Sequence, residues 1–406
     1  MLINIYFPDG VINGEIALAP SKSISNRILI IEALAGKSFE IENLSTSTDT
    51  QSLISALKFE NSVIDVKDAG TTFRFLVSLL SIKPGRWLLT GSKRMKTRPI
   101  GILVECLKSL GANIKYQEKE GFPPILITGQ KLRRKEIEID ANISSQFISS
   151  LMMIAPTIDG GLQLLLKNRI SSLPYLNMTA SIMKSAGVEV KFDKNLIVVP
   201  QGDYDFGKFK IENDWSGASY WYLLCALNPG SKFVLNNLVE KSIQGDSIIS
   251  ELMVQFGVKT VFNSGNAYID SEHCLLKEFN YDFTNCLDLV MTFAVLCIGK
   301  GIKGVFSGVQ NLRIKESDRL NSLKLNLEKC GASVELSNDT IIINSIDLKN
   351  PGRIDVYDDH RIAMAFAPLA SAIGQFEIEN PSVVNKSYPE FWKQIEAAGA
   401  SIQNKL

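Results

Sequence analysis

Short stretches that combine basic and hydroxyl side chains stand at the starts of apolar helical segments in this sequence. The first is "APSKSISNR", in which Pro20 precedes Ser21, Lys22 and Ser23, and Arg27 follows about one turn later. The start of a helix has free backbone N–H groups and a partial positive charge, which favours an anion by about 0.3–1 kcal/mol at an exposed site. Hydrogen bonds from charged lysine or arginine add about 1.5–3 kcal/mol each. Taken alone, the stretch fits either an anion-binding helix start or a solvated helix cap.

The same arrangement recurs, which favours the anion-binding interpretation. Six or more such clusters lie against apolar helical segments in two similar halves of the chain, and we therefore expect helix starts to converge on a polyanionic ligand between domains. The further clusters are Gly70–Arg74 in "DAGTTFR", Arg94 and Arg98 in "RMKTRPIG", Ser144–Gln146 in "ISSQF", Arg313–Arg319 in "LRIKESDR", Asp359–Arg361 in "YDDHR", and Lys386 in "NKSYPEF".

The overall charge and composition narrow the class of protein. Lys plus Arg and Asp plus Glu both number 43, so the net charge is close to zero, which argues against a nucleic-acid or membrane-surface binder. No apolar run reaches the roughly 18 residues of a transmembrane helix, and the start "MLINIYFPDG" lacks the features of a signal peptide, so we expect a cytoplasmic protein. With only 2 histidines, a histidine-based zinc site is not expected.

A helix–glycine–strand pattern recurs along the chain and predicts its organisation. Helically spaced apolar residues lead to a glycine that can end a helix in the left-handed conformation, and alternating residues then begin a strand. Six copies, three in each half, predict an α/β protein of two similar domains. The copies lie at 54–66, 105–116, 181–192, 251–262, 325–336 and 391–403, with Gly111, Gly187, Gly257, Gly331 and Gly399 in the last five.

A second helix in each unit is apolar on nearly all sides, and we expect these helices to be buried inside the domains. Several begin near Ser144, Ser216, Asp288 and Asp359. The stretch 199–215 contains Gly, Asp and Pro, and we expect the two halves to meet there.

Eight segments resemble, in order, the signature segments of the 5-enolpyruvylshikimate-3-phosphate synthase family. They are "APSKSISNR", "DAGTTFRFL", "RMKTRPIG", "SSQF", "QGD", "LRIKESDRL", "DDHRIAMAFA" and "NKSYPEFW". The resemblance implies two domains, each of three βαβαββ units with buried helices and outer sheets, an inside-out α/β barrel. The expected domains are 21–211 and 212–406, with 1–20 as a strand segment of the second.

The resemblance also implies a reaction. The enolpyruvyl group of phosphoenolpyruvate moves to the 5-hydroxyl of shikimate 3-phosphate by addition and elimination, and phosphate leaves. This is a step of the shikimate pathway to chorismate and the aromatic amino acids. No metal or organic cofactor is implied, glyphosate is an expected inhibitor, and we expect a monomer.

The family pattern assigns roles to residues that match it here. The expected catalytic residues are Lys22, Asp288 and Glu316. The expected phosphoenolpyruvate contacts are Lys22, Gly70, Arg98, Gln146, Arg319, Arg361 and Lys386. The expected shikimate 3-phosphate contacts are Lys22, Ser23, Arg27, Ser144, Ser145, Gln146, Ser172, Asp288, Asn311 and Lys315.

Two of these side chains are expected to move protons. Asp288 matches the base for the 5-hydroxyl, and Glu316 matches the residue that transfers a proton at the methylene carbon. Because carboxylates among cations usually stay ionised, Glu316 needs partial desolvation or a proton from Lys22 or Lys386. The chain departs from the family pattern at Asp68, where an asparagine is usual, and we expect its carboxylate to point away from phosphoenolpyruvate.

Two alternatives remain open at this stage. A UDP-N-acetylglucosamine enolpyruvyl transferase shares the expected fold, but that family has a Lys-Asn pair where this chain has Lys22 and Ser23. A non-catalytic anion-binding protein on the same scaffold would not need Asp288 and Glu316 among its cations.

Overall fold

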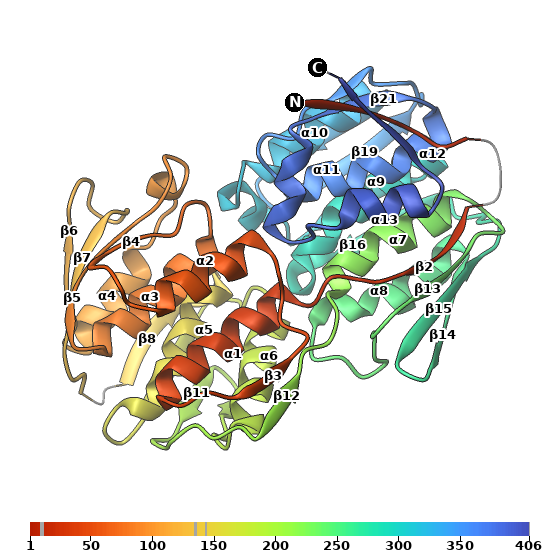
Figure 1. Cartoon of the computed structure of the whole chain (residues 1–406). Helices are drawn as coiled ribbons and strands as arrows, with labels where there is room; N and C mark the ends of the chain where they lie inside the picture. The colour runs from red at the N-terminus through yellow and green to blue at the C-terminus, as the bar shows by residue number, and fades with distance from the viewer. Residues whose placement is uncertain (9–11, 134–135, 143, 406) are drawn as a thin grey trace. The chain divides into compact units, whose positions relative to one another are not determined.

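The chain consists of two compact units, which are described separately. The computed structural model describes residues 1–8, 12–133, 136–142 and 144–405. Unit 1 contains residues 1–20 and 212–406, and unit 2 contains residues 21–211 (Figure 1). The chain therefore starts in unit 1, passes through the whole of unit 2 and returns.

The four-stranded sheets of the described residues share one pairing pattern, in which a parallel pair is followed by two antiparallel pairs. Unit 2 contains β4 (Val63–Asp65), β5 (Gly85–Thr90), β7 (Ile125–Gly129) and β6 (Asn113–Tyr116), and β8 (Glu136–Asp140), β9 (Leu162–Lys167), β11 (Leu196–Val199) and β10 (Lys191–Asp193). It also contains the parallel pair β3 (Glu40–Glu42) and β12 (Lys208–Lys210).

Unit 1 repeats the pattern, and its third sheet is completed by the start of the chain. Strand β1 (Leu2–Tyr6) lies between β21 (Phe376–Glu379) and β22 (Ser401–Lys405) and is antiparallel to both. In the other four-stranded sheets the strand at this position comes from the same part of the chain as its neighbours. The sheets are β2 (Asn13–Ile16), β13 (Lys232–Leu235), β15 (Asn266–Ser271) and β14 (Val258–Asn263); β16 (Glu278–Asp282), β17 (Lys303–Ser307), β19 (Thr340–Ile346) and β18 (Ala332–Leu336); and β20 (Arg353–Ile354), β21 (Phe376–Glu379), β1 (Leu2–Tyr6) and β22 (Ser401–Lys405).

The predicted helix–glycine–strand units are present. All five glycines of the pattern have positive φ, between 82° and 111°, as the left-handed helix end requires. The helical segments before these glycines are α4 (Gly101–Ser109), α6 (Leu173–Ser185), α8 (Ile249–Leu252) with the 3-10 helix η4 (Met253–Phe256), α10 (Arg319–Lys329) and α13 (Phe391–Ala397), and the copy without a glycine contains α2 (Thr48–Leu57).

The apolar helices form the interior of each unit, as predicted. Every residue of α7 (Trp215–Leu227) is buried, and so are Val290–Ile298 of α9 (Val290–Lys300), which packs against it. In unit 2, α1 (Lys22–Ala35), α3 (Gly70–Ile82) and α5 (Ser145–Ile154) contact one another. The expected α/β class with buried helices and outer sheets is confirmed, although the described strands form separate sheets and no closed barrel.

The described helices include none that is long and apolar enough to cross a membrane. This observation agrees with the absence of a long apolar run in the sequence.

We predict that Gly331→Ala strongly destabilises unit 1. Gly331 has a φ of 91°, and an added Cβ would lie 1.9 Å from the carbonyl oxygen of Asp347. Because that neighbour is backbone, we expect the free energy of unfolding to fall by about 4 kcal/mol or more in urea titrations. Gly399→Ala is the control, since Gly399 has a φ of 111° but no atom within 4 Å of an added Cβ. It should lose only about 1–2 kcal/mol, and equal losses in the two variants would contradict the prediction.

Candidate functional site

A buried arginine is the centre of a charged cluster in unit 1. Arg319 is the first residue of α10, and its side chain is 1% exposed. Its Nε donates to Oδ2 of Asp359 at 2.7 Å, and its Nη2 donates to Oε2 of Glu316 at 2.8 Å. Its Nη1 lies 3.3 Å from Oδ1 of Asp288. Burial alone lowers the pKa of Arg319, but the charges of Asp359, Glu316 and Asp288 outweigh it and raise the pKa above its ordinary value.

Asp359 fixes Arg319 from a fully buried position. Its carboxylate is 0% exposed and accepts hydrogen bonds from Nε and Nη2 of Arg319. It also caps α11 (His360–Phe366) by accepting from the backbone N–H of Arg361 at 3.0 Å. One carboxylate therefore joins the start of α10 to the start of α11.

Asp288, one of the predicted catalytic residues, lies between two arginines. It belongs to the 3-10 helix η6 (Leu287–Leu289), directly before α9, and its side chain is 15% exposed. Nη2 of Arg361 lies 2.8 Å from Oδ2 of Asp288, and Arg319 approaches the other oxygen. The carboxylate is therefore held by ion pairs and retains some exposure.

Glu316 lies between Arg319 and a lysine. Nζ of Lys386, at the end of the 3-10 helix η9 (Pro381–Lys386), lies 3.5 Å from Oε1 of Glu316. The Glu316 side chain is 15% exposed, which agrees with the partial desolvation that an acid in this position requires. Asn311 and Lys315 lie in and directly after the 3-10 helix η7 (Gln310–Ile314), and both are half-buried.

Unit 1 thus brings together five residues that the sequence singled out at distant positions. They are Asp288, Glu316, Arg319, Arg361 and Lys386. The cluster contains two carboxylates, which can transfer protons, and three cations, which can bind oxyanions. Arginine and lysine in this number suit a ligand that carries phosphate and carboxylate groups.

In unit 2, Lys22 is the first residue of α1 and is paired with a carboxylate. Ser21 is the helix cap and accepts from the N–H of Ile24 at 3.5 Å. Nζ of Lys22 donates to Oδ2 of Asp49 in the first turn of α2 at 3.0 Å. The two side chains are 13% and 6% exposed, so the lysine charge is stabilised inside the unit while part of it stays accessible.

Gly70 begins α3 and leaves space for two arginines. An added Cβ would lie 2.2 Å from Nη1 of Arg98 and 2.8 Å from Nη1 of Arg74. Arg98 is 6% exposed, and its Nε has no hydrogen-bond partner among the described residues. A buried guanidinium nitrogen without a partner is costly, which supports a binding role for Arg98 toward an anion.

The other predicted residues of unit 2 lie at helix starts. Nε2 of Gln146 donates to Oγ1 of Thr71, next to Gly70, at 2.9 Å. Ser144 caps α5 and Ser145 is its first residue. Ser172 caps α6 and has a left-handed backbone with a φ of 60°.

Arg27 is buried in the helical interior of unit 2. Its Nε donates to Thr179 at 2.7 Å, its Nη1 donates to the carbonyl of Ser23 at 2.9 Å, and its Nη2 lies 3.4 Å from the hydroxyl of Ser149. Burial lowers the pKa of Arg27 to about 10. The guanidinium joins α1, α5 and α6, and its expected contact with a ligand stays a prediction.

Two partners of the predicted residues were not identified from the sequence. Asp49 pairs with Lys22, and Ser216, which donates to Asp246, lies 3.5 Å from Nη2 of Arg361. Asp246 belongs to the second of two "QGD" stretches, at 244–246, and nothing in the sequence indicated its contact with Ser216. Asp49 lies in the first turn of α2, where acidic residues are common because they stabilise the partial positive charge of a helix start.

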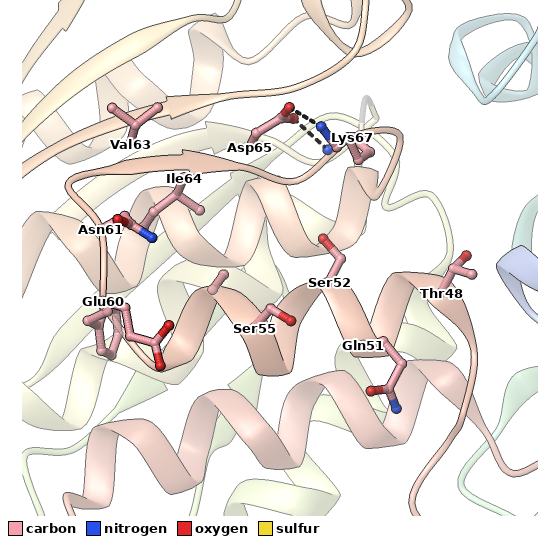
Figure 2. A pocket seen from close by; sticks show the side chains of 12 residues that line it. Thr48, Gln51, Ser52, Ser55, Glu60, Asn61, Val63, Ile64, Asp65 and Lys67 are labelled. Carbon is pink, nitrogen blue, oxygen red and sulfur yellow. Dashed lines mark hydrogen bonds and ion pairs between the residues drawn. The ribbon is translucent and has the colours of Figure 1, made fainter.

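Two further features of unit 2 lie apart from the predicted residues. Asp68 is exposed and accepts a hydrogen bond from Ser92, so its carboxylate has its own partner. A pocket of about 420 Å³ is lined by α2, β4 and the loop between them, together with Lys67. Figure 2 shows its lining side chains, with Asp65 and Lys67 paired. None of the predicted ligand contacts lines this pocket.

Among the described residues, no group of three or more His, Cys, Asp and Glu side chains is arranged to hold a metal ion.

Comparisons with known proteins identify the family. The family model "EPSP synthase (3-phosphoshikimate 1-carboxyvinyltransferase)" matches residues 8–59 and 56–395. A Bacteroides fragilis protein named 3-phosphoshikimate 1-carboxyvinyltransferase is 42% identical over 397 residues, 97% of both chains. A Sulfurovum protein of the same name is 34% identical over 420 residues, covering 96% of this chain and 97% of its own. The structure of EPSP synthase from Acinetobacter baumannii has the same fold, with a TM-score of 0.79 and 20% identity over the full length of both chains.

These matches span nearly the whole chain and define a transferase of the shikimate pathway. The chain belongs to the EPSP synthase family, as the sequence motifs indicated.

We predict that Asp359→Asn destabilises unit 1 because it removes a buried partner of Arg319. Asparagine can still cap α11, but the buried guanidinium of Arg319 then lacks a negatively charged partner. We expect the free energy of unfolding, measured in urea, to fall by about 3–5 kcal/mol. Glu390→Gln is the control, because Glu390 pairs with Lys393 at 2.8 Å on the surface, where both side chains are more than half exposed. That variant should lose less than about 1 kcal/mol. A similar loss in both variants would show that the Asp359–Arg319 pair has no special importance.

Proposed function

We propose that the chain transfers the enolpyruvyl group of phosphoenolpyruvate to the 5-hydroxyl of shikimate 3-phosphate. The hydroxyl oxygen forms a bond to C2 of phosphoenolpyruvate while the methylene carbon gains a proton, and the resulting tetrahedral adduct loses that proton and phosphate. The match of 42% identity over 97% of the chain to a protein named for this reaction supports the proposal. The assigned substrates are therefore small molecules that carry several negative charges.

We assign the proton transfers to unit 1. Asp288 takes the proton of the 5-hydroxyl, and its two arginine partners stabilise the carboxylate before the transfer. Glu316 delivers a proton to the methylene carbon and takes one back during elimination. Lys386 supplies Glu316 with a proton, since its Nζ lies 3.5 Å from Oε1 of Glu316. Arg319, Arg361 and Lys386 bind the phosphate and carboxylate of phosphoenolpyruvate.

We assign the remaining contacts mainly to unit 2. Ser144, Ser145 and Ser172 bind the 3-phosphate through hydroxyl and backbone N–H groups at two helix starts. Gly70 and Arg98 bind phosphoenolpyruvate, and Gln146 contacts both substrates. Lys22 contacts both substrates and stabilises the charge of the adduct, and Ser23, Arg27, Asn311 and Lys315 complete the contacts of shikimate 3-phosphate.

One observation carries the proposal. The buried guanidinium of Arg319 contacts Asp288 through Nη1 and Glu316 through Nη2. A protein that only bound polyanions would weaken its site by placing two carboxylates there. A proton-transfer enzyme requires both. This arrangement favours catalysis over the non-catalytic scaffold, and the names of the curated relatives favour shikimate 3-phosphate over UDP-N-acetylglucosamine as acceptor.

The first functional prediction concerns the two carboxylates. The protein should release phosphate from phosphoenolpyruvate only when shikimate 3-phosphate is present. Asp288→Asn and Glu316→Gln should each lower kcat by about 10²–10⁴-fold, because each removes a proton-transfer group.

Glu328→Gln is the matched control, since Glu328 lies on α10 like Arg319 but pairs with Lys324 in an exposed i,i+4 contact. It should keep the parent kcat. Absence of phosphate release by the parent protein would refute the proposed reaction, and full activity of either carboxylate variant would refute its assigned role.

The second functional prediction concerns Gly70 and glyphosate. In Gly70→Ala the new methyl group displaces the Arg98 guanidinium, because their separation would be 2.2 Å. If glyphosate binds beside Arg98, its inhibition constant should rise about ten- to hundredfold, and KM for phosphoenolpyruvate should rise as well.

Gly101→Ala is the control for this experiment, because Gly101 also begins a helix but its added Cβ would lie 3.4 Å from the nearest atom. Equal inhibition of the Gly70 variant and the parent would show that Arg98 is not a contact of the inhibitor.

A further inference from the structure

A buried carboxylate of unit 1 has no part in the roles assigned above. Asp246 lies in the 3-10 helix η3 (Gly245–Ile248), and the residue is 4% exposed. Its Oδ2 accepts a hydrogen bond from the hydroxyl of Ser216, near the start of α7. Burying a carboxylate is unfavourable, so this position requires a structural or functional reason.

Ser216 joins Asp246 to the catalytic cluster. Its Oγ lies 3.5 Å from Nη2 of Arg361, and the same nitrogen lies 2.8 Å from Oδ2 of Asp288. Because a hydroxyl can donate and accept at once, Ser216 accepts from Arg361 while it donates to Asp246. The contacts form one continuous path from Asp246 to the proposed base.

The segment that carries Asp246 is fixed by other contacts within unit 1. Gln244 accepts from the N–H of Trp215 at 3.2 Å and donates to the carbonyl of Asn213 at 2.7 Å. Glu212 accepts from the hydroxyl of Ser242 at 2.5 Å. These bonds hold the segment against the start of α7, so the position of Asp246 does not depend on a bound substrate.

Asp246 does not form a simple ion pair, because both negative and positive groups lie around it. Burial is the largest of the effects that together raise the pKa of Asp246 to about 7, and the charges of Asp288 and Asp214 act in the same direction. Arg361 and the hydrogen bond from Ser216 oppose these effects. An uncharged residue would avoid the cost of burial, so the carboxylate needs a reason beyond packing.

We infer that Asp246 is a positioning residue, which acts through Ser216 to hold the guanidinium of Arg361 in place against Asp288. The inference rests on the proposed function, in which Arg361 binds phosphoenolpyruvate and Asp288 is the base. An arginine side chain has many rotamers, and a second contact beside the ion pair restricts them. The hydroxyl of Ser216 supplies that contact, and Asp246 orients the hydroxyl so that a lone pair faces Arg361.

The test is a double-mutant cycle on kcat/KM for phosphoenolpyruvate, measured by phosphate release. Asp246→Ala and Ser216→Ala should each lower kcat/KM about tenfold, and the double variant should also lose about tenfold, because both residues act through one contact. Asp246→Asn should recover most of the loss, since its amide oxygen can still accept from Ser216. Glu240→Gln is the matched control, because it removes an exposed carboxylate from the same part of the chain, which the bonds that hold Asp246 do not use.

A second measurement separates this inference from the proposed reaction. Arginine-detected NMR on the full-length protein reports rotation of the Arg361 guanidinium, which should be slow in the parent and in Glu240→Gln. It should be fast in folded Asp246→Ala and Ser216→Ala. Unchanged rotation in those variants, a hundredfold loss in the double variant, or parent-like kcat/KM in Asp246→Ala would each overturn the positioning role. Absence of phosphate release by the parent would refute the reaction, and the NMR result would still decide whether Asp246 positions Arg361.

Discussion

The structure of unit 1 depends on the buried guanidinium of Arg319 and the three carboxylates around it. Burying a charged arginine is costly unless its donors are paired, and Asp359, Glu316 and Asp288 provide partners for Arg319 from separate elements. The same ion pairs that make burial possible place two carboxylates with catalytic potential beside each other. Stability and chemistry therefore rest on one set of contacts, and a change that disturbs Arg319 is expected to affect both.

The predicted basic residues of unit 2 are not gathered around one buried guanidinium, as those of unit 1 are. Lys22 has Asp49 as partner, Arg27 packs among the helices, and Nε of Arg98 is buried with no hydrogen-bond partner among the described residues. Its proposed ligand contacts lie mainly at helix starts, where backbone N–H groups and hydroxyls can bind phosphate without adding carboxylates. The difference agrees with the proposed roles, in which the proton transfers belong to unit 1 and the 3-phosphate of shikimate 3-phosphate is bound by unit 2.

The repeated sheet pattern explains how such distant residues meet. Each unit contains helices of the helix–glycine–strand pattern and buried apolar helices, and polar contacts at helix starts join one kind to the other. The start of α10 and that of α11 are joined by Asp359, and those of α1 and α2 by the Lys22–Asp49 pair. The secondary structure thus supplies the positions, and the side chains supply the charge.

The sequence by itself determined the class of fold, because apolar periodicity and helix-ending glycines are local properties. It also singled out, through contiguous motifs, the five charged residues that the structure brings together in unit 1. It could not identify Asp49 as the partner of Lys22 or Ser216 as the link between Asp246 and Arg361, since these contacts join residues 27 to 145 positions apart. It also did not indicate that Arg27 would be buried among helices. Only the tertiary structure decided these features, because the pairing of a charged side chain depends on which elements pack together, and no local pattern records that packing.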